Sequence, residues 1–165
     1  MRLLGILILS LIPITIGILK YLSLSRECRI LSEFKKLTHL TAGQMRYSLN
    51  EPNVILEFIK SSPQCSKEMG KIIGVILEKS EYSEIFSSLE SLGDCVLPKR
   101  YVGAVSDMFY SLGRSDLEGQ LSNLDYFSAL FTAEEERAKE RFQKKGRLYI
   151  GLAFSLSALV FIILI

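Results

Sequence analysis

The side chains that could carry out chemistry are few and lie far apart along the chain. His39 is the single histidine, and the three cysteines, Cys28, Cys65 and Cys95, form no Cys-x-x-Cys pair. A structural zinc site needs about four such ligands at short spacings, so none is recognisable. No glycine-rich loop ends in Lys-Ser or Lys-Thr, so there is no phosphate-binding loop. These patterns predict that the protein is not an enzyme and holds no cofactor or metal.

The same residues favour structural roles. Lone thiols in a reducing compartment are most often small core hydrophobes, and His39 is expected to be exposed or hydrogen-bonded rather than a base. The acidic residues 134–136 lie in a charged helix in which Glu135–Lys139 and Glu140–Lys144 have the favourable i,i+4 order, worth about 0.3–0.5 kcal/mol per pair. A net charge of only +2 gives no basic face for nucleic acid.

The most specific local signal is residues 112–120, Leu-Gly-Arg-Ser-Asp-Leu-Glu-Gly-Gln. Gly113 is predicted to adopt a left-handed conformation that ends one helix. Ser115 and Glu118 have the spacing of a capping box that begins the next helix, and Asp116 suits its positive first turn. The stretch therefore predicts a tight antiparallel connection between two helices, with no chemistry required.

The elements that position this turn are predicted to be six helices, two long and four short, because apolar residues recur at helical spacing and no segment alternates like a strand. Pro52, Ser66, Ser80 and Pro98 are the predicted starts of the four short helices. The second helix is expected to pack through Val54, Ile55, Phe58 and Ile59. The fold class predicted is all-α.

Both ends of the chain are strongly apolar. Residues 3–19 and 148–165 contain no charge, and the second stretch is about 27 Å long as a helix, close to the ~30 Å core of a bilayer. We expect transmembrane helices over residues 1–19 and 148–165, continuous with the long first and last helices of a bundle over residues 20–147. Gly17 and Gly151 are expected to let the spans pack closely, and Gly146 to act as a swivel.

Basic residues cluster on one side of each apolar stretch. Lys20 follows the first, and Lys144, Lys145 and Arg147 precede the second. Because basic flanks stay inside, this pattern predicts a cytoplasmic bundle with both termini outside. Ser23 and Ser25 also resemble a signal-peptide cleavage site, which leaves open a domain released after Ser25.

The layout resembles the stage III sporulation protein AB family of endospore-forming bacteria. The resemblance covers the whole chain and rests on Leu4-Gly5 and Gly17 in the first apolar stretch, Tyr47 five residues before Pro52, and Leu112-Gly113-x-x-Asp116-x-x-x-Gln120 before a charged helix and a final apolar stretch. The chain departs from the family pattern at Gln44, often an acid, and at Asn53, often Leu.

The resemblance implies a bundle similar to the inner-membrane platform proteins of type II secretion. It also implies a scaffold in the mother-cell membrane surrounding the forespore, with other subunits of the sporulation complex, including a cytoplasmic ATPase, as partners. An adaptor of a secretion or pilus-like machine outside sporulation is the alternative. A membrane enzyme or small transporter would need clustered ionisable groups that the sequence lacks.

Overall fold

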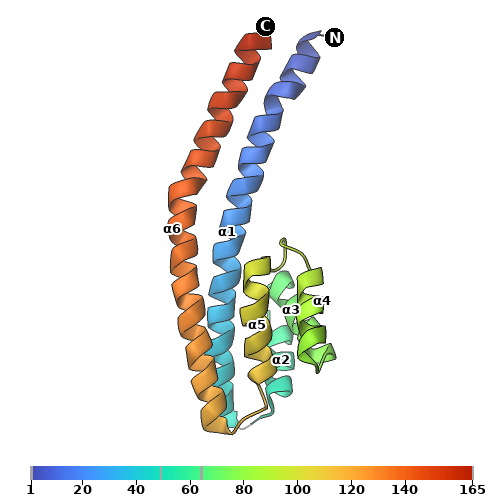
Figure 1. The fold of residues 1–165 in the computed structure, drawn as a ribbon, viewed down its shortest axis with the longest axis vertical. Helices are drawn as coiled ribbons and strands as arrows, with labels where there is room; N and C mark the ends of the chain where they lie inside the picture. Colours follow the sequence, from blue (N-terminus) through green and yellow to red (C-terminus); the bar gives the residue numbers. More distant parts are fainter. Residues whose placement is uncertain (1, 49, 64, 165) are drawn as a thin grey trace. The chain divides into compact units, whose positions relative to one another are not determined.

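The computed structural model describes residues 2–48, 50–63 and 65–164; of residues 2–10, 48, 161 and 164 it describes the backbone only. The described residues form six α-helices and no strand, which confirms the predicted all-α fold. The helices are α1 (Arg2–Ser48), α2 (Pro52–Ser61), α3 (Lys67–Glu78), α4 (Tyr82–Ser91), α5 (Lys99–Ser111) and α6 (Leu117–Leu164) (Figure 1).

The chain divides into two compact units, and both long helices contribute to each. The terminal pair comprises Met1–Arg29 and Glu135–Ile165, and the bundle comprises Ile30–Glu134. The boundaries predicted between the transmembrane helices and the bundle, at residues 19–20 and 147–148, are a different division and stay a prediction.

Most starts of the short helices agree with their local signals. Pro52 occupies the first turn of α2, and the Ser66 side chain accepts a hydrogen bond from the Met69 N–H at 3.1 Å at the start of α3. Pro98 is the N-cap residue of α5, and Asp94 Oδ1 accepts a hydrogen bond from the Lys99 N–H at 3.0 Å. Ser80 is not the start of α4: its N-cap is Glu81, which makes no side-chain capping bond.

The core of the bundle is formed by apolar side chains from all six helices and the α4–α5 connection. Phe34 of α1 stacks on Phe131 of α6 with ring centroids 5.1 Å apart. The largest side chains with less than 2 % exposure are Phe34, Phe131, Leu31, Ile55, Leu56, Ile72, Ile73, Leu89, Leu97, Met108, Leu124 and Val102.

The predicted packing face of α2 is partly wrong. Ile55, Leu56 and Ile59 are buried, whereas Val54 is 51 % and Phe58 65 % exposed. Each residue of a helix is rotated by about 100° from the one before it. In a helix as short as α2, the spacing of the apolar residues therefore does not decide which of them face the core.

In the terminal pair, the first part of α1 and the last part of α6 run side by side (Figure 1). Gly17 is buried, and a Cβ there would lie 2.5 Å from Ala153 Cβ. Gly17 therefore does allow close packing, as predicted. Gly151 does not, because nothing lies within 4 Å of its Cβ position. Gly146 is buried against the Tyr21 ring, and its action as a swivel stays a prediction.

No helix meets the length and apolarity required to cross a membrane when the described residues are searched. The transmembrane helices predicted over residues 1–19 and 148–165, and the Leu4-Gly5 pair in the first of them, extend into residues 1–10, 161, 164 and 165, whose side chains lie outside the described part.

Candidate functional site

The turn between α5 and α6 brings together most of the residues singled out from the sequence. Gly113 has φ of 78°, the left-handed conformation predicted for it. A Cβ on Gly113 would lie 3.9 Å from Pro52 Cγ, so Pro52 lies beside the turn. Tyr47, in contrast, is 91 % exposed, and the structure gives it no part in this cluster.

The predicted capping box at the start of α6 is wrong. Asp116 Oδ1, not the Ser115 hydroxyl, accepts a hydrogen bond from a backbone N–H of the first turn, that of Gly119, at 3.1 Å. The Asp116 carbonyl also accepts from the Gln120 N–H at 3.0 Å, which makes Asp116 the N-cap residue, directly before the first helical residue, Leu117. Glu118 is exposed and makes no reciprocal bond of the predicted kind in the described part of the chain.

Gln120, and not Glu118, reaches back to the backbone of the turn. Its Oε1 accepts a hydrogen bond from the Gly113 N–H at 2.9 Å, and its Nε2 donates to the Ser115 carbonyl at 2.7 Å. The Gln120 amide therefore satisfies one backbone donor, the Gly113 N–H, and one backbone acceptor, the Ser115 carbonyl. Leu112 is half-buried.

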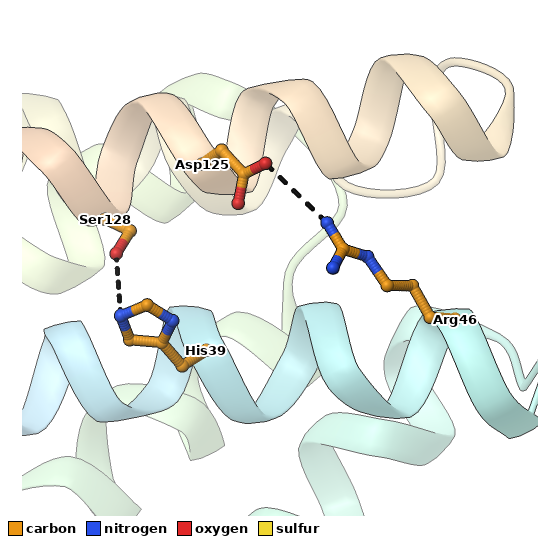
Figure 2. Close-up of polar contacts among 4 residues, drawn as sticks. All are labelled: His39, Arg46, Asp125 and Ser128. Atoms are coloured by element: carbon orange, nitrogen blue, oxygen red, sulfur yellow. Dashed lines mark hydrogen bonds and ion pairs between the residues drawn. The ribbon is translucent and has the colours of Figure 1, made fainter.

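Two polar contacts link α1 and α6 within the bundle (Figure 2). Ser128 Oγ lies 3.1 Å from His39 Nε2, and Arg46 Nη2 lies 3.8 Å from Asp125 Oδ2. His39 is exposed and hydrogen-bonded, in agreement with the structural role predicted for it. The Arg46–Asp125 pair is exposed and adds little stability.

A hollow of about 220 Å³ lies on the bundle between α1, α2 and α3. Its lining includes Leu40 and Phe58, whose side chains are 52 % and 65 % exposed, and Lys36 and Glu33. We call it the apolar groove. The sequence does not predict this groove, because the helical spacing of Phe58 places it on the packing face, whereas its side chain is exposed.

The four basic residues predicted to flank the membrane are all exposed and belong to the terminal pair. Tyr21, next to Lys20, packs on Phe142 with centroids 5.0 Å apart and contacts Gly146. These contacts place Lys20 at the same level of the pair as Lys144, Lys145 and Arg147. Lys144 also pairs with Glu140 at 3.6 Å and Lys139 with Glu135 at 2.7 Å, as predicted.

A buried ion pair in the terminal pair was not predicted. Arg141 Nη2 of α6 donates to Glu27 Oε1 of α1 at 2.6 Å, and the Glu27 side chain is only 8 % exposed. The available signal was spacing: Glu27 precedes the apolar positions Ile30 and Leu31 by three and four residues, and Arg141 follows Ala138 by three. Each therefore falls on the packed face of its helix.

Burial limits the reactivity of Cys28 and Cys65. Burial, and then the Glu27 carboxylate, raises the pKa of the Cys28 thiol, and burial followed by Glu33 raises that of Cys65. Both shifts disfavour a reactive thiolate. Cys95 is exposed, so it is not the core residue predicted. Among the described residues, no group of three His, Cys, Asp or Glu side chains could hold a metal ion.

Comparison with known proteins gives one family. The family model described as stage III sporulation protein AB matches residues 2–165. No curated protein and no solved structure matches the chain. Because the match extends over the whole length, including the Leu112–Gln120 turn and both long helices, the chain belongs to the stage III sporulation protein AB family.

Proposed function

We propose that this protein is a non-enzymatic scaffold subunit of a secretion-like channel complex in the mother-cell membrane that surrounds the forespore. Membership of the family implies a role in stage III of sporulation. The proposal adds that the terminal pair lies in the membrane and that the bundle faces the cytoplasm and binds other subunits.

The observation that carries the membrane proposal is the exposed surface of the terminal pair. On the terminal side of Lys20 and Arg147, large apolar side chains are 47–73 % exposed: Leu11, Ile12, Ile16, Ile18, Leu19, Leu148, Leu152, Phe154, Leu156, Leu159, Ile162 and Ile163. Contiguous apolar surface of this kind marks a membrane or protein contact. Lipid or neighbouring subunits would remove it from water.

The basic residues support one orientation. Lys20, Lys144, Lys145 and Arg147 lie at one level of the terminal pair, on the bundle side of these apolar residues. Basic side chains at such a level favour the cytoplasmic surface, at about 1 kcal/mol each near anionic lipid.

The apolar groove supports a binding role for the bundle. Exposed Leu40 and Phe58 would lose contact with water if a subunit, such as a cytoplasmic ATPase, packed on them. A groove with this lining offers contact area, and the polar residues that also line it, Glu33 and Lys36 among them, would orient the partner.

Co-purification from sporulating membranes in mild detergent tests the proposal. The full chain should bring down further subunits, and Phe58→Glu should reduce their recovery several-fold. Val54→Glu is the matched control, since Val54 is also exposed on α2 but does not line the groove. Recovery of the wild-type chain alone and monomeric would contradict a scaffold role. Equal recovery of partners from non-sporulating cells would favour the adaptor function instead.

A further inference from the structure

A second hollow of the bundle carries positive charge. It has a volume of about 190 Å³ and lies where α3 and α5 end and α2 and α4 begin. Lys79, directly after α3, and Arg114, in the turn after α5, both line it. We call it the cationic hollow. The family-motif residues Pro52 and Leu112 form part of its wall.

The two cations are not neutralised within the described part of the chain. No acidic residue lines the hollow, and neither Lys79 nor Arg114 forms an ion pair with a described residue. Asp107 lies one helical turn before Tyr110, and its carboxylate raises the pKa of Tyr82, so it lies close to the Tyr82 side chain. Two positive charges in a small concave site attract an anion.

Arg114 is held in a fixed position. Its guanidinium carbon lies 3.7 Å from the centroid of the Tyr110 ring, a cation–π contact. A guanidinium stacked by its face keeps its N–H groups in the plane available for a carboxylate, which it can bind through two hydrogen bonds. Lys79 is half-buried, so its ammonium has fewer water contacts to lose when an anion binds.

The charge of the hollow fits an anionic side chain of a partner protein. Leu56, Ile85 and Phe109 also line it but are only 2–5 % exposed, so binding would depend on the two cations rather than on apolar contact. The volume is that of roughly six waters at ~30 Å³ each, enough for one such side chain. We propose that the cationic hollow binds a carboxylate side chain, Asp or Glu, on an acidic segment of a cytoplasmic partner subunit. This inference rests on the proposed scaffold function and assigns a second contact, separate from the apolar groove.

Methyl NMR of the full chain in detergent micelles tests the inference directly. Ile76 and Ile85 line the cationic hollow and Ile59 lines the apolar groove, so selectively labelled isoleucine methyls report on the two sites separately. The probe is a synthetic twelve-residue peptide of alternating Glu and Leu, compared with its Gln and Leu counterpart. The Glu peptide should shift the Ile76 and Ile85 signals, and the Gln peptide should bind at least tenfold more weakly.

Variants show which charges are responsible. Lys79→Gln with Arg114→Gln should weaken binding at least tenfold, and Lys79→Arg should retain it. Lys67→Gln with Lys71→Gln is the control, because these α3 lysines are exposed but do not line the hollow. Equal binding of the two peptides, or equal shifts with inorganic phosphate alone, would overturn the inference. Because the titration measures neither membrane insertion nor co-purification, its failure would leave the proposed function standing.

Discussion

At the scale of single residues, the α5–α6 turn depends on side chains one or two positions away from those predicted. Residues 115–118 match a capping box, but the overlapping residues 116–120 compete with it, and α6 begins at Leu117. Asp116 is then the N-cap, and Gly119 leaves space for it: a Cβ there would lie 2.8 Å from Asp116 Oδ1. Spacing alone cannot decide between overlapping caps, because the choice depends on where the chain leaves α5.

Substitutions at the turn distinguish the two arrangements. Asp116→Ala should lower the free energy of unfolding by about 1 kcal/mol, the usual cost of losing an N-cap. Gln120→Ala removes two hydrogen bonds and should cost about 1–2 kcal/mol. Ser115→Ala and Glu118→Ala are the controls and should each stay within about 0.5 kcal/mol. Denaturant unfolding of the full chain in mild detergent measures the free energy of unfolding of all four variants. A larger loss for Ser115→Ala and Glu118→Ala than for the other two would show that the capping box forms instead.

Gly113 is required for its backbone conformation. At φ of 78°, a side chain costs about 1–2 kcal/mol, so Gly113→Ala should lower the melting temperature and Gly113→Val should lower it further. Gly103→Ala is the control: Gly103 lies inside α5 with nothing within 4 Å of its Cβ position, so the change should stabilise by up to about 1 kcal/mol. An unchanged melting temperature for Gly113→Val would refute the requirement.

At the scale of helices, the sequence predicted the elements whose signals are local. Pro52, Ser66 and Gly113 each act within a few residues, so they could be assigned without knowing the fold. The orientation of α2 and the Glu27–Arg141 pair could not be predicted in this way. The exposure of Phe58 depends on which neighbours α2 packs against, and Glu27 and Arg141 are 114 residues apart along the chain.

The Glu27–Arg141 pair should couple α1 and α6 in the terminal pair. Glu27→Leu or Arg141→Met alone should destabilise the chain by about 3 kcal/mol, the low end for a buried pair because the Arg141 side chain remains 30 % exposed. The double variant Glu27→Leu with Arg141→Met should cost less than either single change, since no buried charge is left without its partner. Additive losses in this double-mutant cycle would show that the two residues do not interact.

The close approach of α1 and α6 in the terminal pair should require glycine at position 17. A Cβ at this position would lie 2.5 Å from Ala153 Cβ and 3.0 Å from the Tyr149 carbonyl oxygen, so even Gly17→Ala should move the helices apart. The nuclear Overhauser contact between the Tyr21 and Phe142 rings, 5.0 Å apart, should weaken. Gly151→Ala should leave it intact, because Gly151 faces open space. An unchanged contact in Gly17→Ala would exclude this packing.

At the scale of the whole molecule, the two units differ in surface chemistry. The terminal pair exposes mainly apolar side chains beyond its basic residues, whereas the bundle has its own core, an apolar groove and a cationic hollow. We propose that the terminal pair lies in the membrane and that the bundle binds partners in the cytoplasm.

Thiol labelling in vegetative cells that express the chain tests this claim most directly, because the surface membrane is the membrane it would enter there and the outer face of that membrane is open to the reagent. In the full chain with Cys28→Ala and Cys65→Ala, the exposed Cys95 of the bundle is the single thiol. We predict that alkaline carbonate leaves the chain in the membrane fraction, and that a membrane-impermeant maleimide labels Cys95 only after the protoplasts are permeabilised. Labelling of Cys95 in intact protoplasts, or release of the chain by carbonate, would contradict the account.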